Sequence, residues 1–258
     1  MNRGVRPGPA LSIYAVLIYL FLHAPLAVLA VFSFNSSKFT VWKGFSLEWY
    51  RAVWNDQLLI ESAWNSLWIA LFSTAIATAA GTLCAYGIWR RRSRFVSASL
   101  YLSMVTPEVV TGVALLALFQ FVFRHVGLQL GMHTVVAAHV AFSLAFVVTV
   151  VLARLRVYDR KLEEAAMDLG ATEWQSFWHV TLPVILPGVI AAALLAFTVS
   201  IDDYVITSFV AGVDSETLPM VIYQMARRGV SPVVNAVSTL IVLGLGVLIL
   251  ISGRLNES

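Results

Sequence analysis

The sequence predicts an all-α, polytopic membrane protein with six transmembrane helices in a single transmembrane domain over residues 1–258. The first observation behind this is composition: 59% of the residues are hydrophobic, only 12% are charged, and the mean hydropathy is +0.83. A soluble domain carries about a quarter charged residues. The second observation is a series of long apolar stretches. Together they exclude a soluble enzyme, a disordered chain and a nucleic-acid-binding domain, and they make the lipid bilayer the expected surroundings.

Six stretches are long enough to cross the apolar core of a bilayer, which takes about 20 residues in a helix. They lie at residues 11–34, 64–89, 96–123, 134–152, 183–210 and 233–251. The first follows Arg3 and Arg6, as a signal sequence would, but its apolar run is too long and no clear A-x-A cleavage motif follows. We therefore expect it to remain as an uncleaved anchor.

Local features refine some of these elements. Residues 47–59 mix apolar, aromatic and charged side chains, which indicates a short helix lying on the membrane surface. Small residues recur at four-residue spacing in the second span and predict close approach of another helix. Pro107 predicts a bend in the third span. The small residues of the second span are Ala77, Gly81 and Ala85.

The distribution of Lys and Arg predicts the orientation, because cytoplasmic loops of membrane proteins carry an excess of basic residues. Six basic residues fall on one side: Lys38, Lys43, Arg51, Arg124, Arg227 and Arg228. Eleven fall on the other: Arg3, Arg6, Arg90, Arg91, Arg92, Arg94, Arg154, Arg156, Arg160, Lys161 and Arg254. The richer side is predicted to be cytoplasmic, so both termini and residues 153–182 face inward. The cluster at residues 90–94 is interpreted as a topology signal.

Residues 153–182 carry the signals of ordered structure. Asp159 is a plausible N-cap, and an apolar stripe at helical spacing follows it. Gly170 occupies the place of a left-handed C-terminal residue, and Thr172 begins a capping box with Gln175. A second helix then leads to Pro183 and the fifth span. We predict two short helices with a sharp corner, which either insert into a groove of another protein or lie on lipid.

The same loop carries a specific resemblance. The loop resembles the EAA signature of the membrane subunits of ABC importers: it has Glu164-Ala165-Ala166, then three residues and Gly170, then nine residues and Val180-x-Leu182-Pro183. Val180 stands where that family usually has Ile. Further segments resemble the spermidine/putrescine permeases, and most of all the second permease of putrescine systems. These segments are residues 33–37, 106–108, 163–172, 200–204 and 229–236.

The resemblance implies the fold and the partners. It implies the ABC importer permease fold, a second homologous permease subunit, two copies of an ABC ATPase, a periplasmic polyamine-binding protein and a location in the bacterial inner membrane. In that family the loop is a cytoplasmic coupling helix that docks on the ATPase. The resemblance therefore assigns ATPase coupling to Glu163, Glu164, Ala165, Ala166, Asp168, Leu169, Gly170 and Ala171.

Acidic residues inside the spans suggest the chemistry of the cargo. Glu108, Asp202 and Asp203 lie within the spans, where there is no Lys or Arg to pair with them. An ionised residue at the bilayer centre costs roughly 2.5–3.5 kcal/mol. These acids therefore face a water-filled cavity, are protonated, or await a cation. The alternative is that they are hydrogen-bonded and fix the packing of the helices. Carboxylates along a pathway replace the water that ammonium groups lose on entry. Tyr204 joins the pathway residues as a cation–π face or else packs at an interface.

Asp202 and Asp203 are neighbours, so on a continuous helix they point about 100° apart and face different surroundings unless the helix is unwound there. His139 is interpreted as a satisfied packing residue. The outward loop near Arg227, Arg228 and residues 231–235 is a candidate contact for the binding protein or an outer gate.

Other functions stay open at this point. An importer of another organic cation or an opine keeps the same architecture, and a secondary transporter would use the acids to carry protons or sodium. The chain has no P-loop, no G-x-S-x-G elbow and no zinc-type spacing of His or Cys, so we expect neither enzymatic activity nor a metal or cofactor.

Overall fold

The structure is a computed structural model that describes residues 9–38, 41–91, 94–229 and 232–255. Regular secondary structure in this part of the chain is helical, apart from an isolated bridge between Asn35 and Phe45. The all-α prediction is therefore confirmed. Four residues used in the sequence analysis lie outside the described ones: Arg3, Arg6, Arg92 and Ser231.

Five helices in the described residues are long and apolar enough to cross a membrane: Ala10–Phe32, Gln57–Arg91, Glu108–Val126, Met132–Arg156 and Glu173–Asp202. A shorter apolar stretch, Pro232–Gly244, begins helix α12 (Pro232–Leu255). These helices follow the order of the predicted spans. The third and fifth predicted spans, however, are not single helices.

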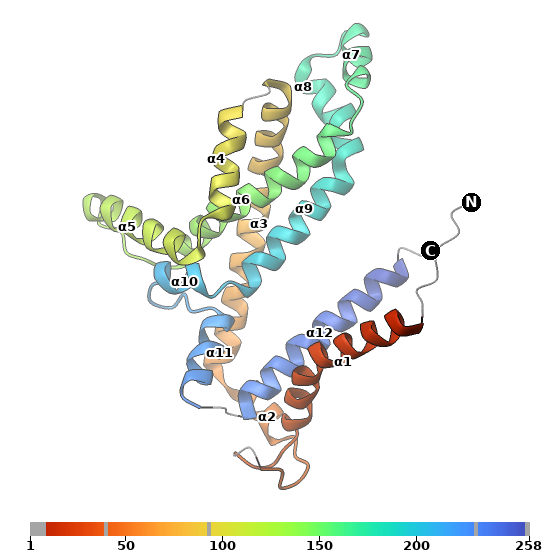
Figure 1. The fold of residues 1–258 in the computed structure, drawn as a ribbon. Coiled ribbons are helices and arrows are strands. Elements are labelled where there is room, and N and C mark those ends of the chain that lie inside the picture. The colour runs from red at the N-terminus through yellow and green to blue at the C-terminus, as the bar shows by residue number, and fades with distance from the viewer. Residues whose placement is uncertain (1–8, 39–40, 92–93, 230–231, 256–258) are drawn as a thin grey trace. The chain divides into compact units, whose positions relative to one another are not determined.

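The chain divides into two compact units, the first of which comprises Met1–Ile60 and Ile222–Ser258. In this unit α12 packs against α1 (Pro9–Phe32) and α2 (Glu48–Asn55) (Figure 1). The predicted short helix is present as α2. It ends before Asp56, whose carboxylate accepts a hydrogen bond from the Leu58 N–H at 3.0 Å and so caps the next helix. That helix therefore begins earlier than the second predicted span.

The second unit, Glu61–Val221, is built on three long helices: α3 (Gln57–Arg91), α6 (Met132–Arg156) and α9 (Leu182–Asp202). The small residues predicted to allow close helix approach lie in its core. Ala77 and Ala85 are fully buried, and a Cβ added to Gly81 would lie 2.6 Å from Cγ1 of Val147 on α6. The absence of a side chain at Gly81 therefore sets how closely α3 and α6 approach.

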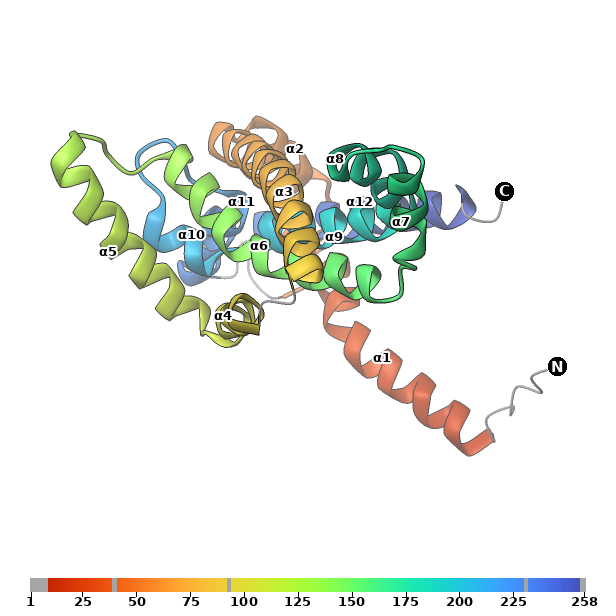
Figure 2. The ribbon, with the colours of Figure 1, turned by 90° about the horizontal axis from the view of Figure 1, so that it is seen from above.

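The third predicted span is wrong as a single helix. It is divided into α4 (Arg94–Val105) and α5 (Glu108–Val126), which run in clearly different directions (Figure 1, Figure 2). Pro107 is extended, with φ −57° and ψ 136°, and begins α5 as its N-cap. Proline has no N–H to continue α4 and disfavours helical geometry at Thr106, so the predicted bend is a complete break.

The fifth predicted span is also interrupted. α9 ends at Asp202, Asp203 is extended with φ −65° and ψ 125°, and the short helix α10 (Val205–Val210) follows. The Asp203 carboxylate accepts hydrogen bonds from the N–H groups of Ile206 and Thr207 at 3.3 and 2.8 Å. An aspartate that satisfies the first N–H groups of a new helix makes this interruption stable.

The predicted elbow between the fourth and fifth spans is confirmed. It consists of α7 (Lys161–Asp168), a corner at Gly170 with φ +95°, and α8 (Glu173–Ser176). Thr172 and Gln175 form the predicted capping box. One feature is additional: α8 continues into α9 through a single π-helical turn, η1 (Phe177–Thr181). The remaining short helix, α11, spans Leu218–Arg227.

Candidate functional site

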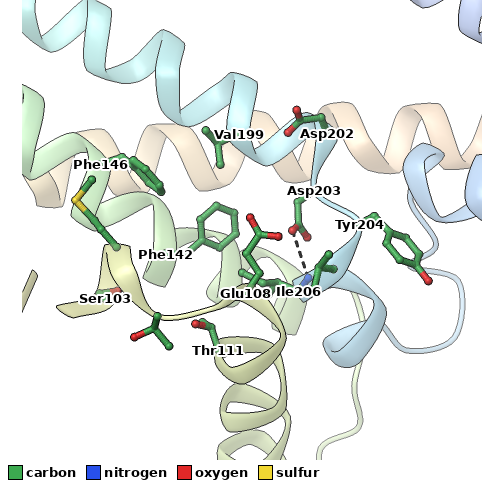
Figure 3. A pocket seen from close by; sticks show the side chains of 13 residues that line it. Ser103, Glu108, Thr111, Phe142, Phe146, Val199, Asp202, Asp203, Tyr204 and Ile206 are labelled. Atoms are coloured by element: carbon green, nitrogen blue, oxygen red, sulfur yellow. Dashed lines mark hydrogen bonds between the residues drawn. The ribbon is translucent and has the colours of Figure 1, made fainter. Parts of the chain in front are cut away.

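The two helix breaks of the second unit enclose a cavity of about 310 Å³ (Figure 3). The start of α5 lies on one side and the link from α9 to α10 on the other, with Phe142 and Phe146 of α6 between them. All four residues predicted for a substrate pathway line this cavity: Glu108, Asp202, Asp203 and Tyr204. The structure therefore brings together residues that lie almost 100 positions apart in the sequence.

The position of Glu108 is set by the helix break at Pro107. It is the first residue of α5, directly after Pro107, and Figure 3 shows its carboxylate reaching up into the cavity beside Phe142. A carboxylate in the first helical turn is favoured by the free N–H groups there. Within the described residues Glu108 forms no ion pair, and its side chain is exposed to the cavity. Its negative charge is available to a ligand.

The two neighbouring aspartates differ in their surroundings. Asp203 lies 3.4 Å from Nε2 of His139 and bonds with the Thr207 hydroxyl at 2.7 Å, so its carboxylate is occupied. Asp202 is exposed and forms no ion pair in the described part of the chain. Figure 3 shows the two side chains pointing apart from adjacent backbone positions. Both aspartates therefore line the cavity, but within the described residues Asp203 is bonded to protein groups whereas Asp202 forms no ion pair.

His139 is the centre of the buried network that holds Asp203. Its side chain is fully buried, with Nδ1 2.7 Å from the Ser200 hydroxyl and Nε2 2.8 Å from the Thr207 hydroxyl. Ser73 of α3 lies 3.0 Å from Ser200 and extends the network to a third helix. The interpretation of His139 as a satisfied packing residue is confirmed. Its position also explains why α9 and α10 keep their geometry without a continuous helix.

The arrangement favours a cation in the cavity. Glu108 and Asp202 place two carboxylates on the wall without a basic partner among the described residues, and aromatic rings of Phe142 and Tyr204 line the same space. Carboxylates with no counter-ion in an apolar surrounding are costly unless a cation or water joins them. A cationic ligand fits these groups better than an anionic or purely apolar one.

The elbow presents a second candidate surface. Leu169 at its corner is 90% exposed, and Leu162 and Trp174 are exposed on either side of it. Most of the predicted coupling residues have accessible side chains or backbone: Glu164, Ala165, Asp168, Leu169 and Gly170 are exposed, whereas Ala166 and Ala171 are half-buried. An apolar corner ringed by acids is suited to a groove on another protein.

Glu163 differs from the other predicted coupling residues. Its side chain is only 1% exposed, and one carboxylate oxygen accepts a hydrogen bond from the Thr181 hydroxyl. The Tyr158 hydroxyl lies 3.4 Å from the same Thr181 oxygen, and burial raises the pKa of Tyr158 above its ordinary value. Glu163 therefore faces the interior of the elbow. A buried side chain cannot contact an ATPase surface, so the prediction that Glu163 contacts the ATPase directly is wrong.

Sequence reasoning missed the link between Arg90 and the elbow. Arg90 donates to Glu173 of α8 at 2.9 Å and to the Tyr86 hydroxyl at 3.0 Å. The Tyr86 ring packs against Phe177 with 4.7 Å between ring centroids. The basic cluster at residues 90–94 signals topology in the sequence, and only the tertiary structure identifies Arg90 as the member that joins α3 to α8.

Comparison with known proteins agrees with the features of both regions. Residues 77–257 match the family model described as "Binding-protein-dependent transport system inner membrane component". The chain is 42% identical to the Escherichia coli (strain K12) spermidine/putrescine transport system permease protein PotC over 242 residues, covering 92% of this chain and 90% of that protein. It is 41% identical to the putrescine transport system permease protein PotI of the same strain over 254 residues, covering 95% and 90%. These two values do not separate a spermidine/putrescine permease from a putrescine permease.

Solved structures share the fold at lower identity. A bacterial ABC transporter that imports the acidic polysaccharide alginate matches with a TM-score of 0.77 and 15% identity, covering 96% of this chain and 94% of that one. The MetNI methionine ABC transporter matches with a TM-score of 0.64 and 21% identity, covering 79% and 95%. At these identities the likeness establishes the fold alone.

Proposed function

Because the chain belongs to the family of binding-protein-dependent transport system inner membrane components, we propose that it is the transmembrane permease subunit of an ATP-driven importer of polyamines, putrescine and spermidine. The relatives named above are spermidine/putrescine and putrescine permeases. Family membership gives no support to a proton- or sodium-coupled secondary transporter or to an enzyme. The observation that carries the choice of cargo is that Glu108 and Asp202, neither of which forms an ion pair within the described residues, line the same cavity.

The cavity is suited to an extended amine. Each ammonium group of a polyamine loses water when it leaves solution, and a carboxylate oxygen replaces those hydrogen bonds with charge-assisted ones. Glu108 and Asp202 lie on different segments, so they offer separate contacts instead of one shared point. Phe142 and Tyr204 line the same cavity, so Phe142 can contact a methylene chain and Tyr204 can offer a ring face to a cation.

The inner elbow supplies the coupling to ATP hydrolysis in this proposal. α7 and the corner at Leu169 dock on one of two copies of an ABC ATPase, while a second homologous permease completes the pathway. A periplasmic polyamine-binding protein delivers the cargo. Closure of the ATPases moves the elbow and turns the cavity outward, and hydrolysis returns it inward, which is alternating access.

The proposed orientation places the elbow and both termini in the cytoplasm and the chain in the bacterial inner membrane. The excess of basic residues on the side of Arg90 and Arg154 supports this direction. On the opposite side, the loop near Arg227 and Arg228 is proposed as the contact for the binding protein or as an outer gate. Crosslinking from Arg228 to the binding protein tests this, and labelling confined to lipid would contradict it.

Transport in vesicles tests the cargo. The chain, assembled with its partner subunits and the binding protein, is expected to take up labelled putrescine in an ATP-dependent manner, with competition by spermidine and not by an opine. Glu108→Gln is expected to lower uptake by about 10-fold, since a charge-assisted hydrogen bond contributes roughly 1.5–3 kcal/mol. Glu48→Gln, at an exposed position at the start of α2, is the charge-matched control. Competition by the opine alone would overturn the choice of polyamines.

A further inference from the structure

A buried carboxylate joins the elbow to the transmembrane part of the second unit. Glu163 lies in the first turn of α7, on a part of the chain that is otherwise largely exposed, yet its side chain is 1% exposed. Its partner Thr181 is fully buried and donates its hydroxyl hydrogen to the Glu163 carboxylate. The two residues are 18 positions apart and lie on opposite sides of the corner at Gly170. This contact therefore connects α7 to the base of α9 directly, without passing through the corner.

Thr181 occupies a special position in the backbone. It is the last residue of η1, the single π-helical turn between α8 and α9, and the Leu182 N–H bonds to the Phe177 carbonyl instead of the one four residues back. The hydrogen-bonded loop of a π-helical turn holds one residue more than that of an α-helical turn, and such turns occur frequently at functional sites. In an α-helix the Leu182 N–H would bond to the Trp178 carbonyl, one residue closer. The Glu163 contact therefore attaches at the end of the π-helical turn, where the chain enters α9.

The segment before the π-helical turn is held by α3. Phe177, the first residue of η1, packs against Tyr86 of α3, and Arg90 of α3 pairs with Glu173 of α8. Trp174 stacks on Phe177 with 5.6 Å between ring centroids. The start of the turn is thus fixed to α3, and its end is fixed to α7. A displacement of α7 relative to α3 acts across the π-helical turn itself.

We propose that the Glu163–Thr181 hydrogen bond is the joint through which displacement of α7 is passed to α9, with the π-helical turn as the element that changes. Glu163 is then a positioning residue: it acts through Thr181 and touches neither cargo nor ATPase. This inference rests on the proposed function, because it needs an ATPase that moves α7. It accounts for an acid that is buried beneath a surface whose other acids are exposed. Loss of the contact leaves α7 attached through its flanking backbone and packing, so movement of the elbow is transmitted incompletely.

The test measures coupling in the assembled complex. The chain is co-expressed with its partner subunits, reconstituted with the binding protein in liposomes, and assayed for putrescine uptake and ATP hydrolysis in the same vesicles. Thr181→Val, which keeps the shape and removes the hydroxyl, and Glu163→Gln are expected to lower the ratio of putrescine imported to ATP hydrolysed by about 10-fold. Co-purification of the ATPase is expected to persist. Thr181→Ser, which keeps the hydroxyl, is expected to restore the ratio.

A matched control and clear contrary outcomes accompany this experiment. Thr198→Val removes an exposed hydroxyl of α9 that donates to the Leu194 carbonyl of its own helix, and it should leave the ratio unchanged. An unchanged ratio in both Thr181→Val and Glu163→Gln overturns the inference. A loss of uptake that merely follows the amount of assembled complex also overturns it, since the contact would then serve folding alone. Absence of ATP-driven putrescine uptake in the unmodified complex would instead contradict the proposed function.

Discussion

The carboxylate of Asp203 lies 3.4 Å from Nε2 of His139, whereas Asp202, its immediate neighbour on the same cavity, forms no ion pair with any residue that the structure describes. Adjacent acids in the same interrupted helix therefore have separate tasks. Asp203 accepts hydrogen bonds from Thr207 of α10 and lies beside His139 of α6, whereas Asp202 contributes its carboxylate to the cavity lining. Substitutions at the two positions should consequently change different properties of the protein.

We expect Asp203→Asn to lower stability and Asp202→Asn to lower transport. Asp203 caps α10 and belongs to a buried network, and loss of a capping carboxylate costs about 1 kcal/mol with a further 1–3 kcal/mol where buried groups lose partners. Thermal unfolding of the detergent-solubilised chain measures the first effect, and putrescine uptake measures the second. A variant at Asp202 that unfolds earlier than the one at Asp203 would contradict this division.

His139→Asn should reproduce part of the effect of Asp203→Asn. The variant loses the contacts of a fully buried ring with Ser200 and Thr207, and the expected loss is about 2–4 kcal/mol because both a cavity and unpaired polar groups result. The double variant with Asp203→Asn should be less destabilised than the sum of the single ones, since the two residues share one network. Additive losses in thermal unfolding would show that they act independently.

Two glycines of α3 provide a matched pair for helix packing. At Gly81 a Cβ would lie 2.6 Å from the Val147 side chain, while at Gly87 nothing lies within 4 Å. Gly81→Ala is expected to destabilise the chain by about 1–3 kcal/mol through overpacking. Gly87→Ala should be neutral or stabilise it by up to about 1 kcal/mol, because alanine favours the helix. Equal unfolding temperatures for the two variants would contradict the packing of α3 on α6.

The corner of the elbow depends on backbone conformation. Gly170 has φ +95°, which L-residues other than glycine rarely adopt, although there is space for a side chain. Gly170→Ala should therefore strain the corner by about 1–2 kcal/mol and weaken capture of the ATPase by the purified chain. Gly87→Ala, the same change at an open position of α3, is the comparison. Retained capture in Gly170→Ala would show that docking does not require this geometry.

The ion pair between Arg90 and Glu173 should contribute little by itself. The Glu173 side chain is 73% exposed, and exposed pairs typically contribute about 0–1 kcal/mol. A double-mutant cycle with Arg90→Gln and Glu173→Gln is expected to give a coupling energy below about 1 kcal/mol, and it should shrink in high salt. A larger value would identify the pair as a main attachment of α8 to α3.

Several elements were predictable because their signals are local. The capping box at Thr172 and the left-handed glycine at Gly170 are set by neighbouring residues, and both appear as expected. The break at Pro107 was predicted only as a bend, although its cause was identified correctly. The interruption at Asp203 has no proline or glycine to mark it. It depends on hydrogen bonds to residues that follow it and on His139 from another helix.

By itself the sequence determined the class of protein and the order of its helices, because hydrophobic length and caps act over short stretches of chain. It also pointed to the acids and to the elbow as the places where function resides. Only the tertiary structure decided which acids are free. His139 meets Asp203, and Thr181 meets Glu163, when helices distant in sequence pack together, and a buried carboxylate is satisfied or left available according to what those neighbours offer.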